Sequence, residues 1–193
     1  MRVLIACEFS GIVRDAFIAR GHEAVSCDLL PSERPGPHIQ GDVLEHLNDG
    51  WDLMIAHPPC TYLTWAGARY WNDEGREDKR KAALRFFMQL YHAPISKVAI
   101  ENPRGYITQA FRRQDQEVNP FDFGEPIRKR VCLWLKNLPP LLMGPFVQVD
   151  PSGSCIKTNG RKYNYYYHQG KTGKGRSRFF ASIANAMAEQ WGS

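Results

Sequence analysis

A short apolar run that ends at two prolines constrains this chain more than any other feature. Residues 52–56 have the character of a buried strand, and His57-Pro58-Pro59-Cys60-Thr61 follows directly. Two consecutive prolines fix φ at about −65° and give no N–H to a sheet, so the strand must end there. Because ligands bind beyond the carboxyl ends of strands in open α/β sheets, we interpret Cys60 as a candidate nucleophile. The alternative is a small buried cysteine that caps a strand.

Strands and helices alternate along the rest of the chain. Residues 2–7 are β-branched and apolar, 8–11 form a turn, and apolar residues from Ile12 recur at helical spacing until Gly21. The same patterns predict strands over 23–27, 97–100 and 131–135, a helix that ends before Pro94, and a last helix over 179–193 that packs on the first. This alternation predicts one α/β domain over 1–193 with a mostly parallel, Rossmann-like sheet.

The composition limits the class of protein. A chain of 193 residues, 43% of them hydrophobic, can bury the core of one domain. No apolar stretch approaches the ~18 residues of a membrane span, and the first residues form a strand and not a signal peptide, so we expect a cytoplasmic protein without a membrane partner. The five cysteines are odd in number and form no Cys-x-x-Cys pair, so we expect neither a disulfide framework nor a metal site.

Two acids at predicted strand ends indicate a nucleoside site. Gly11 follows the first strand, where a glycine lets the backbone approach a ligand at the start of a helix. Asp28 ends the second strand 17 residues later, a spacing typical of an acid that binds ribose hydroxyls, and Asp42 follows a short extended piece. Together they favour an adenosine ligand. The alternative is that each acid merely ends a strand.

A second reactive group follows a second buried strand. Glu101-Asn102-Pro103 comes directly after residues 97–100, and Cys60 and Glu101 meet at one sheet edge if their strands are neighbours. Attack of a thiolate on C6 of cytosine makes C5 nucleophilic, and an acid at N3 must compensate the charge that builds up on the ring. The pair therefore predicts cytosine chemistry.

Four short motifs together resemble the cytosine-5 DNA methyltransferases. They are Phe9-Ser10-Gly11, Pro58-Pro59-Cys60, Glu101-Asn102-Pro103 and Arg128-Lys129-Arg130, in the order and strand context of that family. The resemblance covers roughly residues 1–136, with a looser likeness in the last helix, and the small size is similar to phage and prophage members. It implies a Rossmann-like, S-adenosylmethionine-dependent methyltransferase fold and methyl transfer to C5 of cytosine in DNA.

The resemblance also implies a role for each matching residue. Cys60 matches the nucleophile that attacks C6, Glu101 the residue that protonates N3, and Asn102 a residue that braces the nucleophile's loop. Arg128 and Arg130 match a pair that contacts the flipped base and its phosphate or supports the glutamate. The positions implied for S-adenosylmethionine, with the Phe9 ring on the adenine, are Phe9, Ser10, Gly11, Asp28, Asp42 and Pro58.

The segment 137–178 stands where the family has a far longer target-recognition domain. Its tyrosines at 163, 165 and 167 alternate along one predicted strand face. Residues 151–193 hold 7 Lys+Arg against 1 Asp+Glu, whereas residues 1–150 hold 18 against 19. The candidate contacts to nucleic acid, with little sequence preference, are therefore Lys171, Lys174, Arg176 and Arg178. The alternative is a tyrosine-rich hairpin with a solvated basic loop.

The residues after Cys60 are rich in rings. Residues 61–71 contain four aromatic side chains and one arginine, which favours either a loop with stacking surfaces over a site or rings that belong to the core. The run 73–81 is mixed in charge. We expect it to be solvated and assign it no function.

Three alternatives to DNA cytosine-5 methylation remain open. The same chemistry on a free nucleotide such as deoxycytidylate suits a chain without a recognition domain. His57-Pro58-Pro59 also resembles the Pro-Pro element of amino-methyltransferases, although His57 and Cys60 argue against that class. The third alternative is a non-catalytic nucleic-acid-binding protein on the same fold.

Overall fold

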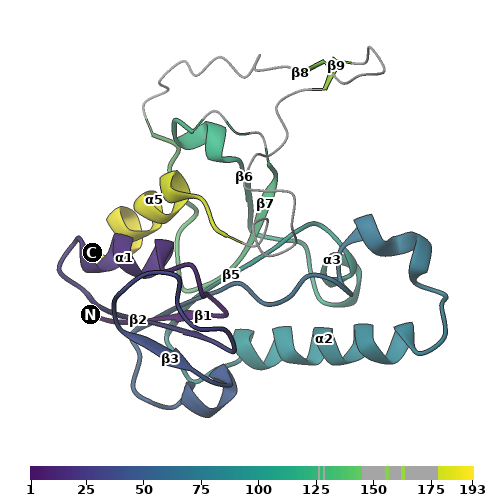
Figure 1. The fold of residues 1–193 in the computed structure, drawn as a ribbon, viewed down its shortest axis with the longest axis horizontal. Helices are drawn as coiled ribbons and strands as arrows, with labels where there is room; N and C mark the ends of the chain where they lie inside the picture. Colours follow the sequence, from purple (N-terminus) through teal and green to yellow (C-terminus); the bar gives the residue numbers. More distant parts are fainter. Residues whose placement is uncertain (126, 128, 145–154, 157–161, 164–177) are drawn as a thin grey trace.

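A seven-stranded sheet forms the centre of the computed structural model, which describes residues 1–125, 127, 129–144, 155–156, 162–163 and 178–193 (Figure 1). The strand order is β3-β2-β1-β4-β5-β7-β6. β7 runs antiparallel to β5 and β6, and all other neighbours pair in parallel. The strands are β1 (Arg2–Ala6), β2 (Glu23–Asp28), β3 (His38–Gln40), β4 (Leu53–Ala56), β5 (Lys97–Asn102), β6 (Gln116–Val118) and β7 (Val131–Lys136).

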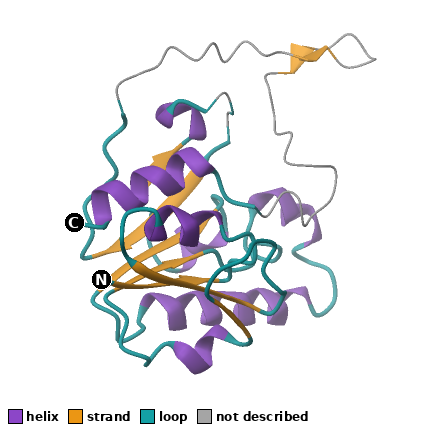
Figure 2. Ribbon diagram, turned by 60° about the vertical axis from the view of Figure 1, so that its left-hand side comes forward, coloured by secondary structure: helices purple, strands orange, loops and turns teal. Residues whose placement is uncertain are grey.

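Helices cover both faces of the sheet (Figure 2). One face holds α1 (Ile12–Ile18), α5 (Ala181–Trp191) and the 3₁₀-helix η3 (Pro120–Phe123), and the other holds α2 (Arg76–Tyr91), α3 (Tyr106–Ala110) and η1 (Val43–His46). The 3₁₀-helix η2 (Trp65–Tyr70) precedes α2, and β8 (Cys155–Ile156) and β9 (Lys162–Tyr163) form a separate antiparallel pair. Within the described residues, no helix is long and apolar enough to span a bilayer.

The strand residues alternate between two apolar cores. Val3 and Ile5 of β1 pack with α1 and α5, whereas Leu4 and Ala6 pack with α2 and η1, and all four are 0% exposed. A strand that is buried on both faces needs a continuous apolar sequence, which β1 and β4 have. The protein is therefore an α/β protein with a mostly parallel mixed sheet, as the alternation of elements predicts.

The carboxyl ends of four strands meet at one edge of this sheet. In the parallel register Ala6 lies opposite both Cys27 and Ala56, and Ala56 lies opposite Ile100. The chain winds from β1 to β2 and β3 on one side, then crosses to β4 and β5 on the other. In open α/β sheets, ligands bind in the crevice at such a reversal of strand order.

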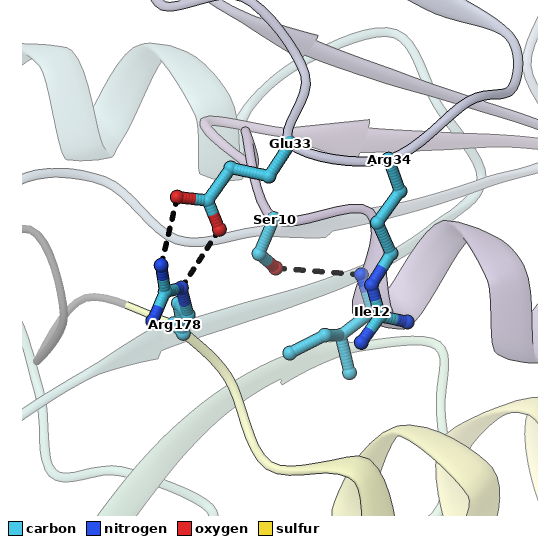
Figure 3. Close-up of a pocket in the computed structure, with 5 residues that line it drawn as sticks. All are labelled: Ser10, Ile12, Glu33, Arg34 and Arg178. Atoms are coloured by element: carbon cyan, nitrogen blue, oxygen red, sulfur yellow. Dashed lines mark hydrogen bonds and ion pairs between the residues drawn. The ribbon is translucent and has the colours of Figure 1, made fainter. Parts of the chain in front are cut away.

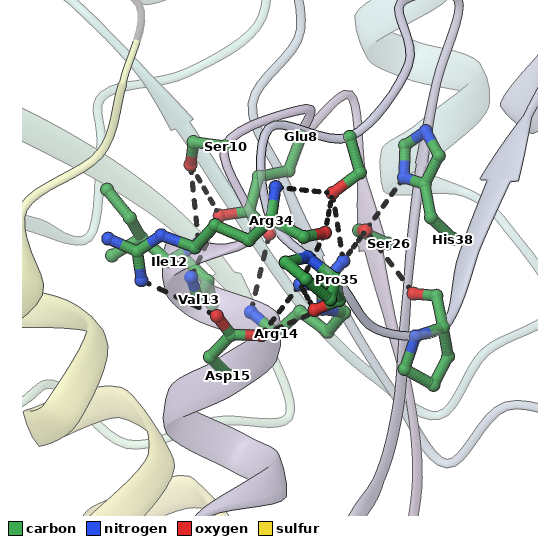
Figure 4. A network of polar contacts seen from close by, with 12 residues as sticks. Glu8, Ser10, Ile12, Val13, Arg14, Asp15, Ser26, Arg34, Pro35 and His38 are labelled. Atoms are coloured by element: carbon green, nitrogen blue, oxygen red, sulfur yellow. Dashed lines mark hydrogen bonds and ion pairs between the residues drawn. The ribbon is translucent and has the colours of Figure 1, made fainter.

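A buried arginine fixes the proline-rich loop 31–37 (Figure 4). Arg14 of α1 is 0% exposed, and its guanidinium pairs with Asp15 at 2.8 Å and donates to the Pro35 carbonyl at 2.9 Å. Several acceptors are what make a buried charge tolerable. A Cβ at Gly11 would lie 2.6 Å from Arg14 Nη2, and Gly11 has φ +71°, so this turn requires glycine.

The last helix packs on the first one, as the sequence predicts. Trp191 at the end of α5 donates its indole N–H to the Pro139 carbonyl at 2.9 Å, and Gln190 exchanges two hydrogen bonds with Leu142 at 2.7 and 2.9 Å. Several boundaries differ from the prediction. β5 continues to Asn102, so Glu101 and Asn102 belong to the strand, and the last helix spans Ala181–Trp191 rather than 179–193. β1 ends at Ala6 because Cys7 has φ +58°, and α1 ends at Ile18, before the left-handed turn at Gly21.

Candidate active site

Cys60 and Glu101 come from neighbouring strand ends. β4 and β5 pair in parallel with Ala56 opposite Ile100, so the turn after β4 lies beside the Glu101 side chain. Cys60 is partly exposed, and the Glu101 side chain is 17% exposed. The structure thus brings the predicted nucleophile and the predicted acid to one edge of the sheet, where both remain accessible.

Backbone and side-chain hydrogen bonds link the two turns. Asn102 is 0% exposed and donates from Nδ2 to the Pro58 carbonyl at 2.9 Å, a contact that the implied bracing role requires. The backbone N–H of Tyr106 donates to the Leu63 carbonyl at 2.7 Å, beside a bridge between Thr64 and Gly105. A Cβ at Gly105 would lie 1.9 Å from the Leu63 carbonyl oxygen, so only glycine permits this close approach.

The Cys60 thiol lies in a mixed electrostatic environment. Burial raises the pKa of this thiol above its ordinary value, and the Glu101 carboxylate raises it further, whereas Lys129 and a backbone hydrogen bond lower it. At neutral pH the sulfur is therefore protonated and must lose its proton before it can attack. Lys129 is the cation that favours the thiolate, and the sequence analysis gave this residue no role of its own.

His57 is a second site residue that the sequence analysis missed. Its Nδ1 lies 3.6 Å from Oε2 of Glu101, its side chain is 9% exposed, and its ring packs on Phe179 at a centroid distance of 4.5 Å. His57 Nε2 is buried and has no hydrogen-bond partner in the described part of the chain. Its place at the end of β4, opposite Glu101, is the signal that could have identified it.

Asp28 and Asp42 converge near the end of β1. Their charges, together with burial as the largest cause, raise the pKa of the Cys7 thiol, so both carboxylates lie close to Cys7. Oδ1 of Asp28 accepts from the Leu30 N–H at 2.9 Å, and Oδ1 of Asp42 accepts from the Leu44 N–H at 3.0 Å. In both acids the described structure leaves Oδ2 without a partner.

The N-terminal turn of α1 already has an anion of its own. The buried Glu8 carboxylate accepts from the backbone N–H groups of Val13 at 2.8 Å and Arg14 at 3.3 Å, and from Ser10 Oγ at 3.0 Å (Figure 4). Glu8 therefore occupies two backbone donors at this helix start, and the expected approach of a ligand to the turn stays a prediction. Gly11 accommodates the Arg14 guanidinium. Phe9 is 6% exposed, and its predicted contact with adenine stays a prediction.

A cavity of about 560 Å³ lies beside this turn (Figure 3). It is lined by Ser10, Ile12, Glu33, Arg34 and Arg178. Arg178 makes a two-pronged ion pair with Glu33, at 2.7 and 2.9 Å. This pair joins the segment before α5 to the proline-rich loop, and it occupies a guanidinium that the sequence analysis assigned to nucleic acid.

The remaining predicted cations fall into two groups. Arg130 is exposed and pairs with Glu117 at 3.1 Å, so no described contact brings it to Glu101 or Cys60. Arg128, Lys171, Lys174 and Arg176 lie outside the described residues, as does the tyrosine strand beyond Tyr163.

Within the described residues, no group of three or more histidine, cysteine or acidic side chains is arranged to hold a metal ion. No protein-family model matches the chain, and no curated protein matches it significantly. The function of this site therefore has to be inferred from its residues and their geometry.

Proposed function

We propose that this protein transfers a methyl group to C5 of cytosine in DNA, with S-adenosylmethionine as methyl donor. The observation that carries the proposal is the placement of Cys60 and Glu101 on adjacent strand ends, within electrostatic reach of each other. A thiol and a carboxyl group are the two groups that this reaction needs at C6 and N3. The order β3-β2-β1-β4-β5 is also the order of the first five strands in dinucleotide-binding sheets.

The residues at the ends of β1 to β3 fit S-adenosylmethionine. Asp28 and Asp42 each retain one carboxylate oxygen for a ribose hydroxyl or an adenine amine. The cavity beside Ser10 and Arg34 offers room for the amino acid end of the molecule, and the Arg34 guanidinium, which also pairs with Asp15 at 3.4 Å, lies at its edge. When bound, S-adenosylmethionine supplies an electrophilic methyl group.

The residues of the chain supply the other steps. The cytosine must leave the duplex stack, which costs a few kcal/mol, before Cys60 can reach it. The Cys60 thiol gives its proton to the Glu101 carboxylate. The thiolate then forms an Sγ–C6 bond while Glu101 passes that proton to N3, and the electron pair of the C5–C6 double bond becomes available at C5 for the methyl group. Loss of the C5 proton to water restores that double bond, breaks the Sγ–C6 bond and releases the thiolate. The N3 proton returns to Glu101.

Two neighbours hold these groups in position. His57 lies beside the Glu101 carboxylate on the β4 side, with Nδ1 3.6 Å from Oε2, and its ring packs on Phe179. Asn102 fixes the turn that positions Cys60 through its bond to Pro58. Preorganised groups of this kind reduce the reorganisation that the reaction needs.

A serine in place of the nucleophile tests the proposal. Cys60→Ser should abolish labelled methyl incorporation into DNA and the denaturant-resistant complex with 5-fluorocytosine DNA, because serine is a much weaker nucleophile at C6. Cys155→Ser is the matched control and should retain both. Full activity of Cys60→Ser would refute the proposal. Incorporation into deoxycytidylate but not into DNA would favour the nucleotide alternative.

A further inference from the structure

Arginines and aromatic rings gather next to the Cys60 turn. The guanidinium carbon of Arg69 lies 4.5 Å from the Tyr70 ring centroid, that of Arg76 lies 5.6 Å from the same ring, and that of Arg104 lies 5.2 Å from the Trp65 ring. Arg80 lies 5.0 Å from the ring of Trp71. We call this set the platform and define it as Trp65, Arg69, Tyr70, Arg76, Arg80 and Arg104.

Among the described residues, seven arginines pair with a carboxylate, whereas the platform arginines have no such partner. Arg14, Arg112 and Arg178 form the shortest of these ion pairs, at 2.7–2.8 Å. In the described structure, no acid lies within ion-pair distance of Arg69, Arg76, Arg80 or Arg104. The acids at positions 73, 74, 77 and 78, although close in sequence, form no ion pair with these four arginines in the described structure.

Four acids lie at positions 73, 74, 77 and 78, close to the platform in the chain. Glu77 pairs with Lys81 at 2.7 Å, and the other three form no ion pair with any described residue. All four side chains are exposed. The platform therefore keeps uncompensated guanidinium groups although carboxylates are available in the same segment.

Buried donors in the platform also lack acceptors. Nε of Arg76 and Nε of Arg80 are buried without a hydrogen-bond partner in the described residues, as is Nε1 of Trp71, which lies outside the platform beside Arg80. A buried donor without a partner costs free energy. An anion bound by the outer ends of these guanidinium groups would offset part of that cost through charge-assisted hydrogen bonds.

The platform is joined directly to the catalytic turn. The N–H groups of Leu63 and Thr64 donate to the Cys60 carbonyl at 2.9 and 3.0 Å, and the N–H of Trp65 donates to the Arg104 carbonyl at 3.4 Å. The rings of Trp65 and Tyr70 are 39% and 42% exposed. The platform thus presents charge and ring surface on segments that are hydrogen-bonded to the Cys60 turn or follow it directly.

We propose that the platform binds the DNA strand next to the target cytosine, with its arginines on phosphates and its exposed rings against unstacked bases. This inference rests on the proposed function, from which it takes DNA as the substrate. Guanidinium groups on aromatic rings bind phosphate while the rings accept any base, so the contact reads no sequence.

A binding experiment in the Cys60→Ser background tests the platform without any chemistry. The probe is a short fluorescent DNA, single-stranded in one arm and duplex in the other, followed by anisotropy over a series of salt concentrations. Arg69→Gln/Arg104→Gln removes two exposed platform cations. Arg85→Gln/Arg113→Gln is the matched control, because these two arginines are also exposed and unpaired among described residues but lie outside the platform.

The platform variant should lower the slope of log K against log salt by about 1.8 on duplex DNA, because each phosphate contact contributes about 0.9. If the plots of log K against log salt for the parent and the platform variant meet near 1 M salt, the affinity of the variant at about 0.1 M salt falls on the order of 50-fold. The control should keep the parental slope. Equal slopes in the parent and the platform variant, or equal losses in both double variants, would overturn the inference even if methyl transfer is established. Loss of binding confined to the platform variant supports it even if no methyl transfer is found.

Discussion

On the β1–β3 side of the crevice each acid has a hydrogen-bond partner in its own turn, whereas on the β4–β5 side two buried polar atoms have none among the described residues. Glu8 caps α1, and Asp28 and Asp42 each accept from an N–H two residues onward. On the β4–β5 side, His57 Nε2 and Asn102 Oδ1 are buried without hydrogen-bond partners in the described residues. Buried polar atoms are normally satisfied, so those two exceptions indicate where a ligand completes the structure.

The two sides also differ in the sequence distance that their contacts span. The turns after β1, β2 and β3 are closed by residues two to six positions apart. The β4–β5 side depends on contacts between residues 44 positions apart, such as Asn102 with Pro58. The acids of the first side are therefore held by their own turns, although Arg14 reaches Pro35 and Arg178 reaches Glu33 on that side. The second side exists only when the sheet has formed.

Breaking the close approach between the two turns should have the largest effect. Gly105→Ala places a Cβ against the Leu63 carbonyl, so backbone must move, and we expect a loss of about 3 kcal/mol in the free energy of unfolding together with loss of methyl transfer. Urea unfolding followed by circular dichroism measures the free energy of unfolding. Gly144→Ala, with open space around its Cβ, is the control. Equal stability of the two variants would contradict the contact.

Removing one charge from the β1–β3 side should affect cofactor binding alone. Asp28→Asn keeps an oxygen for the Leu30 N–H but loses the charge and the second acceptor, so affinity for S-adenosylmethionine should fall roughly 10- to 100-fold. Isothermal calorimetry measures this loss, and Glu45→Gln, an exposed acid on η1, should leave the affinity unchanged. An unchanged dissociation constant in Asp28→Asn would show that Asp28 does not bind S-adenosylmethionine.

The smallest effects concern the protonation of Cys60. Its pKa is raised by burial and then by Glu101, so alkylation by iodoacetamide should rise only in the alkaline range as the thiolate forms. Glu101→Gln removes a negative charge and should move that rise to lower pH, while Lys129→Met removes a positive charge and should move it to higher pH. Peptide mass spectrometry follows Cys60 separately from the other cysteines. Shifts in the opposite directions would contradict the arrangement of charges.

Sequence reasoning located the strands and the two reactive turns because prolines and apolar runs mark strand ends locally. It placed Cys60 and Glu101 together only on the condition that their strands were neighbours, which the sheet order then met. His57 was missed because its importance comes from Glu101, which lies 44 positions along the chain. The platform was predicted in part, because the rings over 61–71 suggested a stacking surface, whereas the run 73–81, which contributes Arg76 and Arg80, was assigned no function.

The anchoring of residues 139–142 to α5 bears on how the length of this chain can vary. Trp191 and Gln190 hold the chain where it leaves β7, and Arg178 holds it to Glu33 where it returns. The entropy of closing a loop grows only slowly with the number of residues in it. Segments of very different size can therefore be exchanged between these fixed points without disturbing either core, which makes this the natural place to graft a module that selects a DNA sequence.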